Sequence, residues 1–206
     1  MKNKYPRVLD LKDKATKRIP FFCSEYLFSG TGDDKVVKGN ANIFNHVFLT
    51  PRYLKGTVKP STKQAILGME YSAPFGVAPM GSAGLIWPGA ETALAKMCTE
   101  KDIPYCLSSV ASLSLEQVAP NLNGKGWFQL YPPKDKTIRD DIIKRALESD
   151  YSALVVTVDI PATSRKERLL KAGITIPPKL NLRTFFQALA KPIWALNTLL
   201  HGMPSF

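Results

Sequence analysis

Four polar side chains stand at or near the ends of short apolar segments and could hold a flat, hydrogen-bonding molecule. They are Ser108, Gln129, Tyr131 and Thr157. In an extended strand, residues two apart point to the same face, so Gln129 and Tyr131 point one way. An amide or a hydroxyl can both donate and accept hydrogen bonds, which suits the edge of a planar heterocycle such as a flavin. Because the rim of any α/β fold contains polar residues, this is one of several chemistries that the set permits.

A stretch of mostly small side chains, Ala78-Pro79-Met80-Gly81, could bring backbone against such a ring with little obstruction. Other chemistries lack their motifs, since the chain has neither G-x-G-x-x-G nor a P-loop. His46 and His201 are its two histidines, and neither follows a strand-like segment, so we expect structural roles for both. The three cysteines form no C-x-x-C pair and lie near no histidine. This predicts no metal site, no disulfide framework and a reducing compartment.

These residues lie in a regular alternation of strand-like and helix-like segments. Apolar strand-like segments begin at intervals of about 25 residues, at 75–79, 105–108, 127–131 and 153–159. Helix-like segments separate them, at 91–98, 112–118 and 135–148. This βα alternation predicts a parallel sheet with both faces covered, either open or closed into a barrel. The polar residues then gather at the carboxyl edge, where α/β folds build their sites.

Two local patterns support the predicted helices. Ser114 and Gln117 have the spacing of a capping box at the start of a helix. The segment 135–148 places five apolar residues at helical spacing, which predicts that one side is buried: Ile138, Ile142, Ile143, Ala146 and Leu147.

The two ends of the chain depart from this alternation. In residues 1–70 the sequence predicts a basic, amphipathic helix pair that ends near 29–32, followed by a mixed extended segment at 42–56. Together these would form an arm that caps a barrel. Residues 71–168 would form the first half of the barrel. Residues 169–206 are rich in apolar side chains and interrupted by proline, which leaves two interpretations open. They form either an excursion packed on the protein itself or an interfacial membrane anchor.

The composition is that of a globular protein, with 45% hydrophobic residues among 206. No apolar run is long enough to span a membrane, and the basic start is not followed by a signal-peptide core. The net charge of +11 comes from scattered lysines and arginines, locally dense at 12–18 and 165–171. This charge has two interpretations. It forms either a solvated basic surface or a surface that attracts an anionic cofactor or an acidic membrane. No nucleic-acid-binding signature accompanies it, so no nucleic acid partner is predicted.

Six segments, in order, resemble the FMN-dependent α-hydroxy acid dehydrogenase and oxidase family, which includes L-lactate dehydrogenase, mandelate dehydrogenase and glycolate oxidase. They are "YLFSGTGDD" (26–34), "NIFNHVFLTPRYL" (42–54), "FGVAPMGSAGL" (75–85), "CLSSVASLSLEQVA" (106–119), "FQLYPPKD" (128–135) and "LVVTVDIP" (154–161). The tail is most similar to the membrane-associated lactate and mandelate dehydrogenases.

The resemblance implies a (β/α)8 TIM barrel that holds FMN at its mouth, of which this chain supplies an N-terminal helical arm and about the first four βα units. It implies two groups of site residues. The cofactor-binding group is Pro79, Met80, Gly81, Ser108, Gln129 and Thr157. The substrate-binding group is Tyr26, Tyr131 and Lys166.

The chain departs from the family pattern in three places. Met80 stands where many members carry threonine, so only a backbone contact is available there. Lys166 stands where the family has arginine, which keeps the charge and loses the bidentate fork, and Arg165 lies beside it. The family's catalytic histidine belongs to later strands, beyond Phe206. We therefore expect a fragment of about half a barrel, since a complete one takes about 250 residues.

The resemblance implies oxidation of an L-2-hydroxy acid, L-lactate first among them, with hydride transfer to FMN and no activity by this chain alone. The electron acceptor would be a quinone or cytochrome in a dehydrogenase and oxygen in an oxidase. A full-length member would be a homo-oligomer in the cytoplasm or on the cytoplasmic face of the inner membrane. The alternative is a non-catalytic half-barrel that serves as a binding or oligomerisation module.

Overall fold

The structure is a computed structural model that describes residues 5–57, 59–158, 166–174 and 181–201. The described residues form two compact units. One unit contains residues 59–158, and the other contains residues 5–57 together with 166–174 and 181–201. The sequence separates the arm from the tail, whereas the structure places residues 5–57 of the arm in one unit with the described tail residues, and residues 59–70 of the arm in the unit that contains the sheet.

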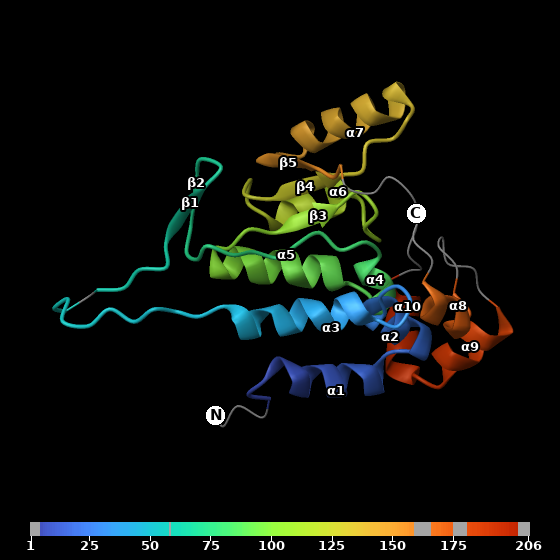
Figure 1. Ribbon diagram of the computed structural model, residues 1–206. Helices are drawn as coiled ribbons and strands as arrows, with labels where there is room; N and C mark the ends of the chain where they lie inside the picture. Colours follow the sequence, from blue (N-terminus) through green and yellow to red (C-terminus); the bar gives the residue numbers. More distant parts are fainter. Residues whose placement is uncertain (1–4, 58, 159–165, 175–180, 202–206) are drawn as a thin grey trace. The chain divides into compact units, whose positions relative to one another are not determined.

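The first unit contains a parallel sheet whose strands follow chain order (Figure 1). Among the described residues it consists of β3 (Cys106–Ser108), β4 (Trp127–Leu130) and β5 (Ala153–Val156). An isolated parallel bridge joins Val77 to Tyr105, so the segment predicted at 75–79 runs alongside the sheet with a single bridge. The predicted alternation and parallel direction are confirmed, and each strand is shorter than the apolar segment that contains it.

Helices connect the bridged segment around Val77 to β3, and each strand of this sheet to the next. They are α4 (Ala83–Ile86), α5 (Ala90–Lys101), α6 (Leu115–Val118) with the short helix η2 (Ala119–Asn121), and α7 (Lys136–Glu148). The predicted capping box is confirmed at α6, where the Ser114 hydroxyl accepts from the Gln117 backbone and the Gln117 side chain accepts from the Ser114 backbone. At α7, the Asp135 carboxylate accepts from the backbone of Thr137 at 2.8 Å.

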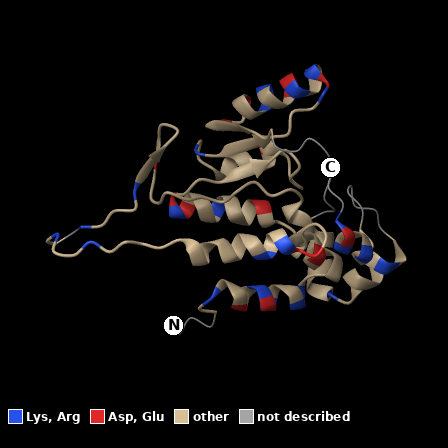
Figure 2. Ribbon diagram, viewed as in Figure 1, with Lys and Arg blue, Asp and Glu red and all other residues tan. Residues whose placement is uncertain are grey.

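The core lies between one face of the sheet and these helices. Phe128 and Leu130 of β4 pack there, with Ile142, Ile143 and Ala146 of α7. The prediction that Ile138 and Leu147 share the buried side is wrong, because both are exposed. At about 100° per residue, each lies roughly a quarter-turn from the centre of the buried arc. Figure 2 shows that charged residues of both signs occupy much of the remaining surface of α7.

A β-hairpin that the sequence did not predict precedes the sheet. Its strands are β1 (Gln64–Ile66) and β2 (Met69–Tyr71), paired antiparallel. Leu67 and Gly68 both have positive φ, which suits a two-residue hairpin loop. The Tyr71 hydroxyl accepts from the Trp127 indole at 3.1 Å and donates to the Lys125 carbonyl, which fixes the hairpin beside β4.

The second unit is helical. It consists of α1 (Val8–Arg18), α2 (Phe21–Phe28), α3 (Lys35–Asn42), the short helix η1 (Ile43–His46), α8 (Glu167–Ala172), α9 (Leu182–Leu189) and α10 (Pro192–His201). The predicted helix pair is confirmed as α1 and α2. The Phe22 ring meets the Trp194 ring edge-on at 5.8 Å between centroids, and the Phe22 backbone donates to the Gln187 side chain. Helices far apart in sequence therefore share one core.

Gly76 allows the segment around Val77 to approach the sheet. A Cβ at this position would lie 2.4 Å from the Pro104 carbonyl oxygen, which accepts a hydrogen bond from Val77. We expect Gly76→Ala to lower the free energy of unfolding by about 1–3 kcal/mol, because rigid backbone must move. Gly39→Ala is the control, since its Cβ would meet nothing within 4 Å and alanine favours the helix. Denaturant unfolding checks both, and a Gly76→Ala midpoint equal to wild type would contradict the expectation.

Candidate functional site

Three of the predicted cofactor residues form a continuous hydrogen-bonded row across the sheet. The Ser108 hydroxyl donates to the Gln129 side-chain oxygen at 2.9 Å, and the Gln129 side-chain nitrogen donates to the Thr157 hydroxyl at 2.7 Å. Ser108 pairs with Gln129 in the parallel register, and Thr157 directly follows β5. The structure therefore brings together Ser108, Gln129 and Thr157, as the sequence predicted.

The row lies on the face of the sheet opposite the core. Phe128 and Leu130 alternate with Gln129 along β4 and face the helices. Gln129 is 2% exposed, so its amide is held in place by its hydroxyl neighbours. A buried amide with partners on both sides has few alternative orientations.

The donor set of this row fits a flavin. The bond from Ser108 uses one oxygen lone pair of the Gln129 amide, and the bond to Thr157 uses one of its hydrogens, which leaves a second of each. The Thr157 oxygen accepts from Gln129, so its hydroxyl hydrogen can be donated elsewhere. Ser108 also accepts from the Val110 backbone at 3.2 Å. The row thus keeps both donors and acceptors for the heteroatoms at the edge of a planar ring.

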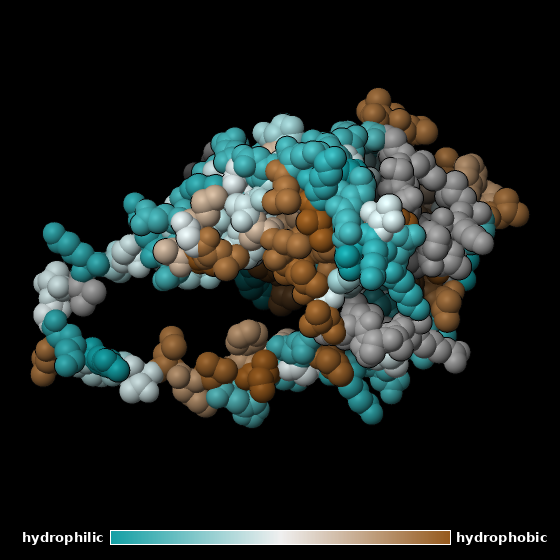
Figure 3. Space-filling model, turned by 90° about the horizontal axis from the view of Figure 1, so that it is seen from above, coloured by the Kyte–Doolittle hydropathy of each residue, from teal (hydrophilic) through white to brown (hydrophobic). Residues whose placement is uncertain are grey.

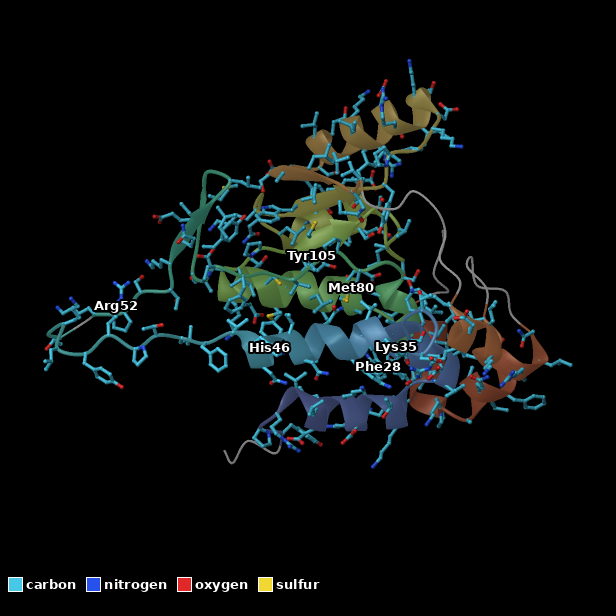
Figure 4. All side chains as sticks on the ribbon, viewed as in Figure 1. Phe28, Lys35, His46, Arg52, Met80 and Tyr105 are labelled. Atoms are coloured by element: carbon cyan, nitrogen blue, oxygen red, sulfur yellow. The ribbon has the colours of Figure 1, made fainter. Side chains whose placement is uncertain are left out.

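The segment that contains Pro79, Met80 and Gly81 lies between the Val77 bridge and α4. The backbone of Ser82, the next residue, donates to the Val110 carbonyl at 2.8 Å, which ties this segment to the loop that follows β3. Pro79 and Met80 are exposed, and Figure 4 shows Met80 near α4. Tyr131 directly follows β4. Its side chain is half-exposed, and its backbone donates to the Ser109 hydroxyl at 3.1 Å.

The remaining predicted substrate residues belong to the helical unit. Tyr26 lies on α2 and Lys166 is the N-cap of α8, and both are partly exposed. Arg165, the alternative to Lys166, lies outside the described residues, as does Asp159. Both histidines are exposed on helical turns, His46 at the end of η1 (Figure 4) and His201 at the end of α10.

Sequence reasoning missed a buried carboxylate near α4. Glu91 is 1% exposed, and one of its oxygens accepts from the backbone of both Gly84 and Ser112 at 3.0 and 2.9 Å. This joins the loop after β3 to the start of α5. The signal was an acidic residue in the first turn of a predicted helix, a position that favours a carboxylate near backbone N–H groups.

Ion pairs and burial perturb several groups around the sheet. Arg145 of α7 binds the Glu116 carboxylate at 2.6 Å and lowers its pKa to about 2. Arg145 also lines a cavity of about 320 Å³ whose other lining residues include Phe128, Ile142 and Ser108 of the row. Burial raises the pKa of the Cys106 thiol to about 11, which agrees with its place as a small core residue. Among the described residues, no group of acidic, cysteine or histidine side chains could hold a metal ion.

The sheet topology and the polar row define part of a βα barrel with a flavin-compatible edge. Comparison with known proteins agrees. The family model described as FMN-dependent dehydrogenase matches residues 15–205, so this chain belongs to that family. Its fold is that of the family's TIM barrels, in part, and the family's cofactor is FMN.

Similar proteins include (S)-mandelate dehydrogenase of Pseudomonas putida, 32% identical over 96% of this chain and 50% of the relative. An L-lactate dehydrogenase of Vibrio parahaemolyticus is also 32% identical, over 95% of this chain and 51% of the relative. A crystal structure of the monotopic membrane protein (S)-mandelate dehydrogenase superposes with a TM-score of 0.90 at 30% identity, over 98% of this chain and 54% of that one. The chain spans about half the length of the curated relatives it matches.

Gln129 is the centre of the row, and its loss removes the acceptor of the Ser108 hydroxyl and the donor to the Thr157 hydroxyl. We expect Gln129→Leu to lower the free energy of unfolding by about 1–3 kcal/mol, because Ser108 is buried and loses its acceptor. Gln117→Leu is the matched control, since this glutamine is exposed and caps α6 away from the row. Urea unfolding of both variants gives the comparison. Equal losses in the two would show that the row contributes nothing beyond an exposed glutamine.

Proposed function

We propose that this chain takes part in the FMN-dependent oxidation of an L-2-hydroxy acid to the 2-oxo acid, with L-lactate as the substrate. The observation that carries the proposal is the row Ser108–Gln129–Thr157, a buried amide held between two hydroxyls at the carboxyl edge of a parallel sheet. Family membership supports it, and so do relatives that are named as lactate and mandelate dehydrogenases.

The proposed flavin-binding residues differ in what they offer. Gln129, with Ser108 and Thr157, would hydrogen-bond the ring, because the amide keeps unused donor and acceptor capacity. The backbone of Pro79, Met80 and Gly81 would lie against the ring. Since methionine carries no hydroxyl, only main-chain atoms can hydrogen-bond at that position.

Three residues are proposed to bind the hydroxy acid. Tyr26 and Tyr131 carry phenols that can donate to a carboxylate, and Lys166 supplies positive charge without the fork of an arginine. A point charge fixes the orientation of a carboxylate less strictly than a bidentate guanidinium does. Binding of the acid by this chain should therefore rely more on its tyrosines than on its cation.

The chemistry divides between bound cofactor and protein. Bound FMN would supply the acceptor for the hydride that leaves the α-carbon of the acid. A general base must remove the hydroxyl proton, and both His46 and His201 lie exposed in the helical unit. We propose that this base comes from the part of the family's fold that this sequence does not cover. The residues of this chain bind and orient the two reactants.

Flavin binding is the direct test of this proposal. We expect the purified chain to quench FMN fluorescence on titration. Gln129→Leu should abolish the quenching and Gln117→Leu should leave it unchanged. A colourless wild-type protein that self-associates would instead favour the non-catalytic oligomerisation module. That alternative draws on the exposed apolar residues of and after β5, which are Leu154, Val156 and Val158.

Activity and substrate choice are tested by complementation. The chain is co-expressed with the C-terminal half of the Pseudomonas putida (S)-mandelate dehydrogenase, and dye reduction is followed with L-lactate and with (S)-mandelate. Turnover only in the complemented sample, and faster with L-lactate, is the expected result. Turnover by this chain alone would contradict the assignment of the base to another part of the fold.

The helices α9 and α10 support a second proposal, that this unit docks on a membrane surface. Their polar residues Thr184 and Thr198 are buried, whereas all of their large apolar residues except Trp194 are exposed. The exposed set is Leu182, Phe185, Phe186, Leu189, Ile193, Leu196, Leu199 and Leu200. In Figure 3, hydrophobic side chains stand out at the margin of the view on the side where α8 to α10 lie. Exposed apolar side chains on a helix favour contact with an apolar surrounding such as the interior of a lipid layer.

Peripheral contact is the form that the described helices allow. None of them combines the length and hydrophobicity that a bilayer crossing requires. A basic residue, Lys191, lies between α9 and α10, next to their exposed apolar residues. Its ammonium donates to the Lys17 carbonyl of α1 at 2.8 Å. The similar (S)-mandelate dehydrogenase structure is itself described as a monotopic membrane protein. We propose a location on the cytoplasmic face of the inner membrane.

Co-sedimentation with vesicles tests this location. We expect the chain to sediment with vesicles that contain anionic lipid, and Phe185→Ser combined with Leu199→Ser to reduce the bound fraction about tenfold, since buried apolar area is lost. Ile138→Ser combined with Leu147→Ser on α7 is the matched control, because it removes two exposed apolar residues from the other unit. Equal loss in both pairs would contradict a specific role for α9 and α10.

A further inference from the structure

We infer that Arg168 is a positioning residue that clamps α2 to α8 and so sets the place of Tyr26 relative to Lys166. The inference rests on the proposed function, because it concerns two residues proposed to bind the hydroxy acid. All three residues lie in the helical unit.

The clamp consists of one guanidinium between two carboxylates. Arg168 donates through Nε and Nη2 to the two oxygens of Glu25 at 2.7 and 2.6 Å, and through Nη1 to Asp34. Glu25 directly precedes Tyr26 on α2, and Asp34 is the N-cap of α3. Lys166 is the N-cap of α8, two residues before Arg168. One side chain therefore joins three helices that carry or flank the proposed substrate residues.

Burial makes this interaction stronger than a surface ion pair. The Glu25 and Asp34 side chains are only 10% and 15% exposed, whereas exposed pairs are screened by water. The backbone of Gly30 and the Arg168 guanidinium hold the pKa of Asp34 below its ordinary value, and the two carboxylates raise that of Arg168. Loss of the guanidinium would leave two carboxylates close together with little solvent.

Further bonds extend the clamp into the loop after Tyr26. The Gly30 backbone donates to Asp34 at 2.7 Å, and the Gly32 backbone donates to Glu167 at 3.0 Å. The start of α8 thus fixes both the helix that carries Tyr26 and the loop that follows it. Such a connection is long-range, since Arg168 and Glu25 are 143 residues apart in sequence.

Lysine cannot replace this arginine. Three nitrogens of a planar fork bind two carboxylates at once, and an ammonium offers a single point charge on a flexible stem. Arg168→Lys therefore keeps the positive charge while it removes the planar set of donors that binds both carboxylates. This separates a positioning role from simple neutralisation of Glu25 and Asp34.

The experiment places 3-fluorotyrosine at position 26 alone in the 206-residue chain. We compare Arg168→Lys, Arg168→Gln and Glu25→Gln with wild type. Arg145→Gln is the matched control, because it removes another two-pronged arginine pair, with Glu116, in the other unit. The measurements are the fluorine resonance, amide exchange in segments 21–34 and 166–174, and the unfolding temperature.

The expected result is a shifted or broadened fluorine resonance in all three clamp variants, with about tenfold faster exchange in both segments and unchanged exchange in α5 and α7. Glu25→Gln combined with Arg168→Gln should add little to Arg168→Gln alone, because loss of the guanidinium already removes the pair with Glu25. Arg145→Gln should lower the unfolding temperature and leave the fluorine signal unchanged. An unchanged resonance in the clamp variants, or exchange that rises equally across the chain, would overturn the inference.

A second arm separates this inference from the proposed function. Titration with pyruvate, the 2-oxo acid product expected from L-lactate, should move the fluorine resonance in wild type, and Arg168→Lys should need about tenfold more pyruvate for the same movement. If wild type does not respond, the proposed role of Tyr26 in binding the acid fails. The clamp is still decided by the resonance and exchange measured without pyruvate.

Discussion

The candidate site depends on one constraint, the parallel in-register pairing of β3, β4 and β5. Neighbouring strands in a sheet lie about 4.8 Å apart, so hydroxyls on two outer strands can both reach an amide on the middle one. Gln129 occupies that middle position, between Ser108 and Thr157. A shift of one residue along β4 would turn Gln129 into the helix-side core and bring an apolar side chain into the row. Packing of Phe128 and Leu130 against the helices prevents this shift.

The two units differ in how they bury polar residues and expose apolar ones. In the sheet unit, polar side chains are buried where they bond to one another, as in the row, or to backbone N–H groups, as at Glu91. In the helical unit, buried carboxylates meet Arg168, while α9 and α10 expose apolar residues to their surroundings. Buried polar groups need partners, and exposed apolar faces need a cover. Within the described residues the first requirement is met for the row and for Arg168, whereas one Glu91 oxygen and the Ser112 hydroxyl are buried without a partner. The second requirement supports the proposed membrane contact.

Much of the sheet unit could be predicted because its signals are local. The apolar segments, the capping box at Ser114 and the polar residue ending each strand can all be recognised in short windows. The side of α7 that faces the core was less predictable. Ile138 and Leu147 have the right spacing and are nevertheless exposed, because the buried arc also depends on how the helix lies on the sheet. The β1–β2 hairpin was missed, as its strands are only three residues each.

The sequence by itself determined the alternation of strands and helices, and with it the edge at which Ser108, Gln129 and Thr157 end their strands. It also determined the family, through ordered segments that span most of the chain. Only the tertiary structure decided that these three side chains bond to one another, and that Arg168 meets Glu25 and Asp34 rather than solvent. The physical reason is distance along the chain. The row joins residues 21 and 28 apart on different strands, and Arg168 reaches Glu25 over 143 residues, so neither pairing leaves a periodic signal within one element. The first depends on strand register and the second on how the helices pack.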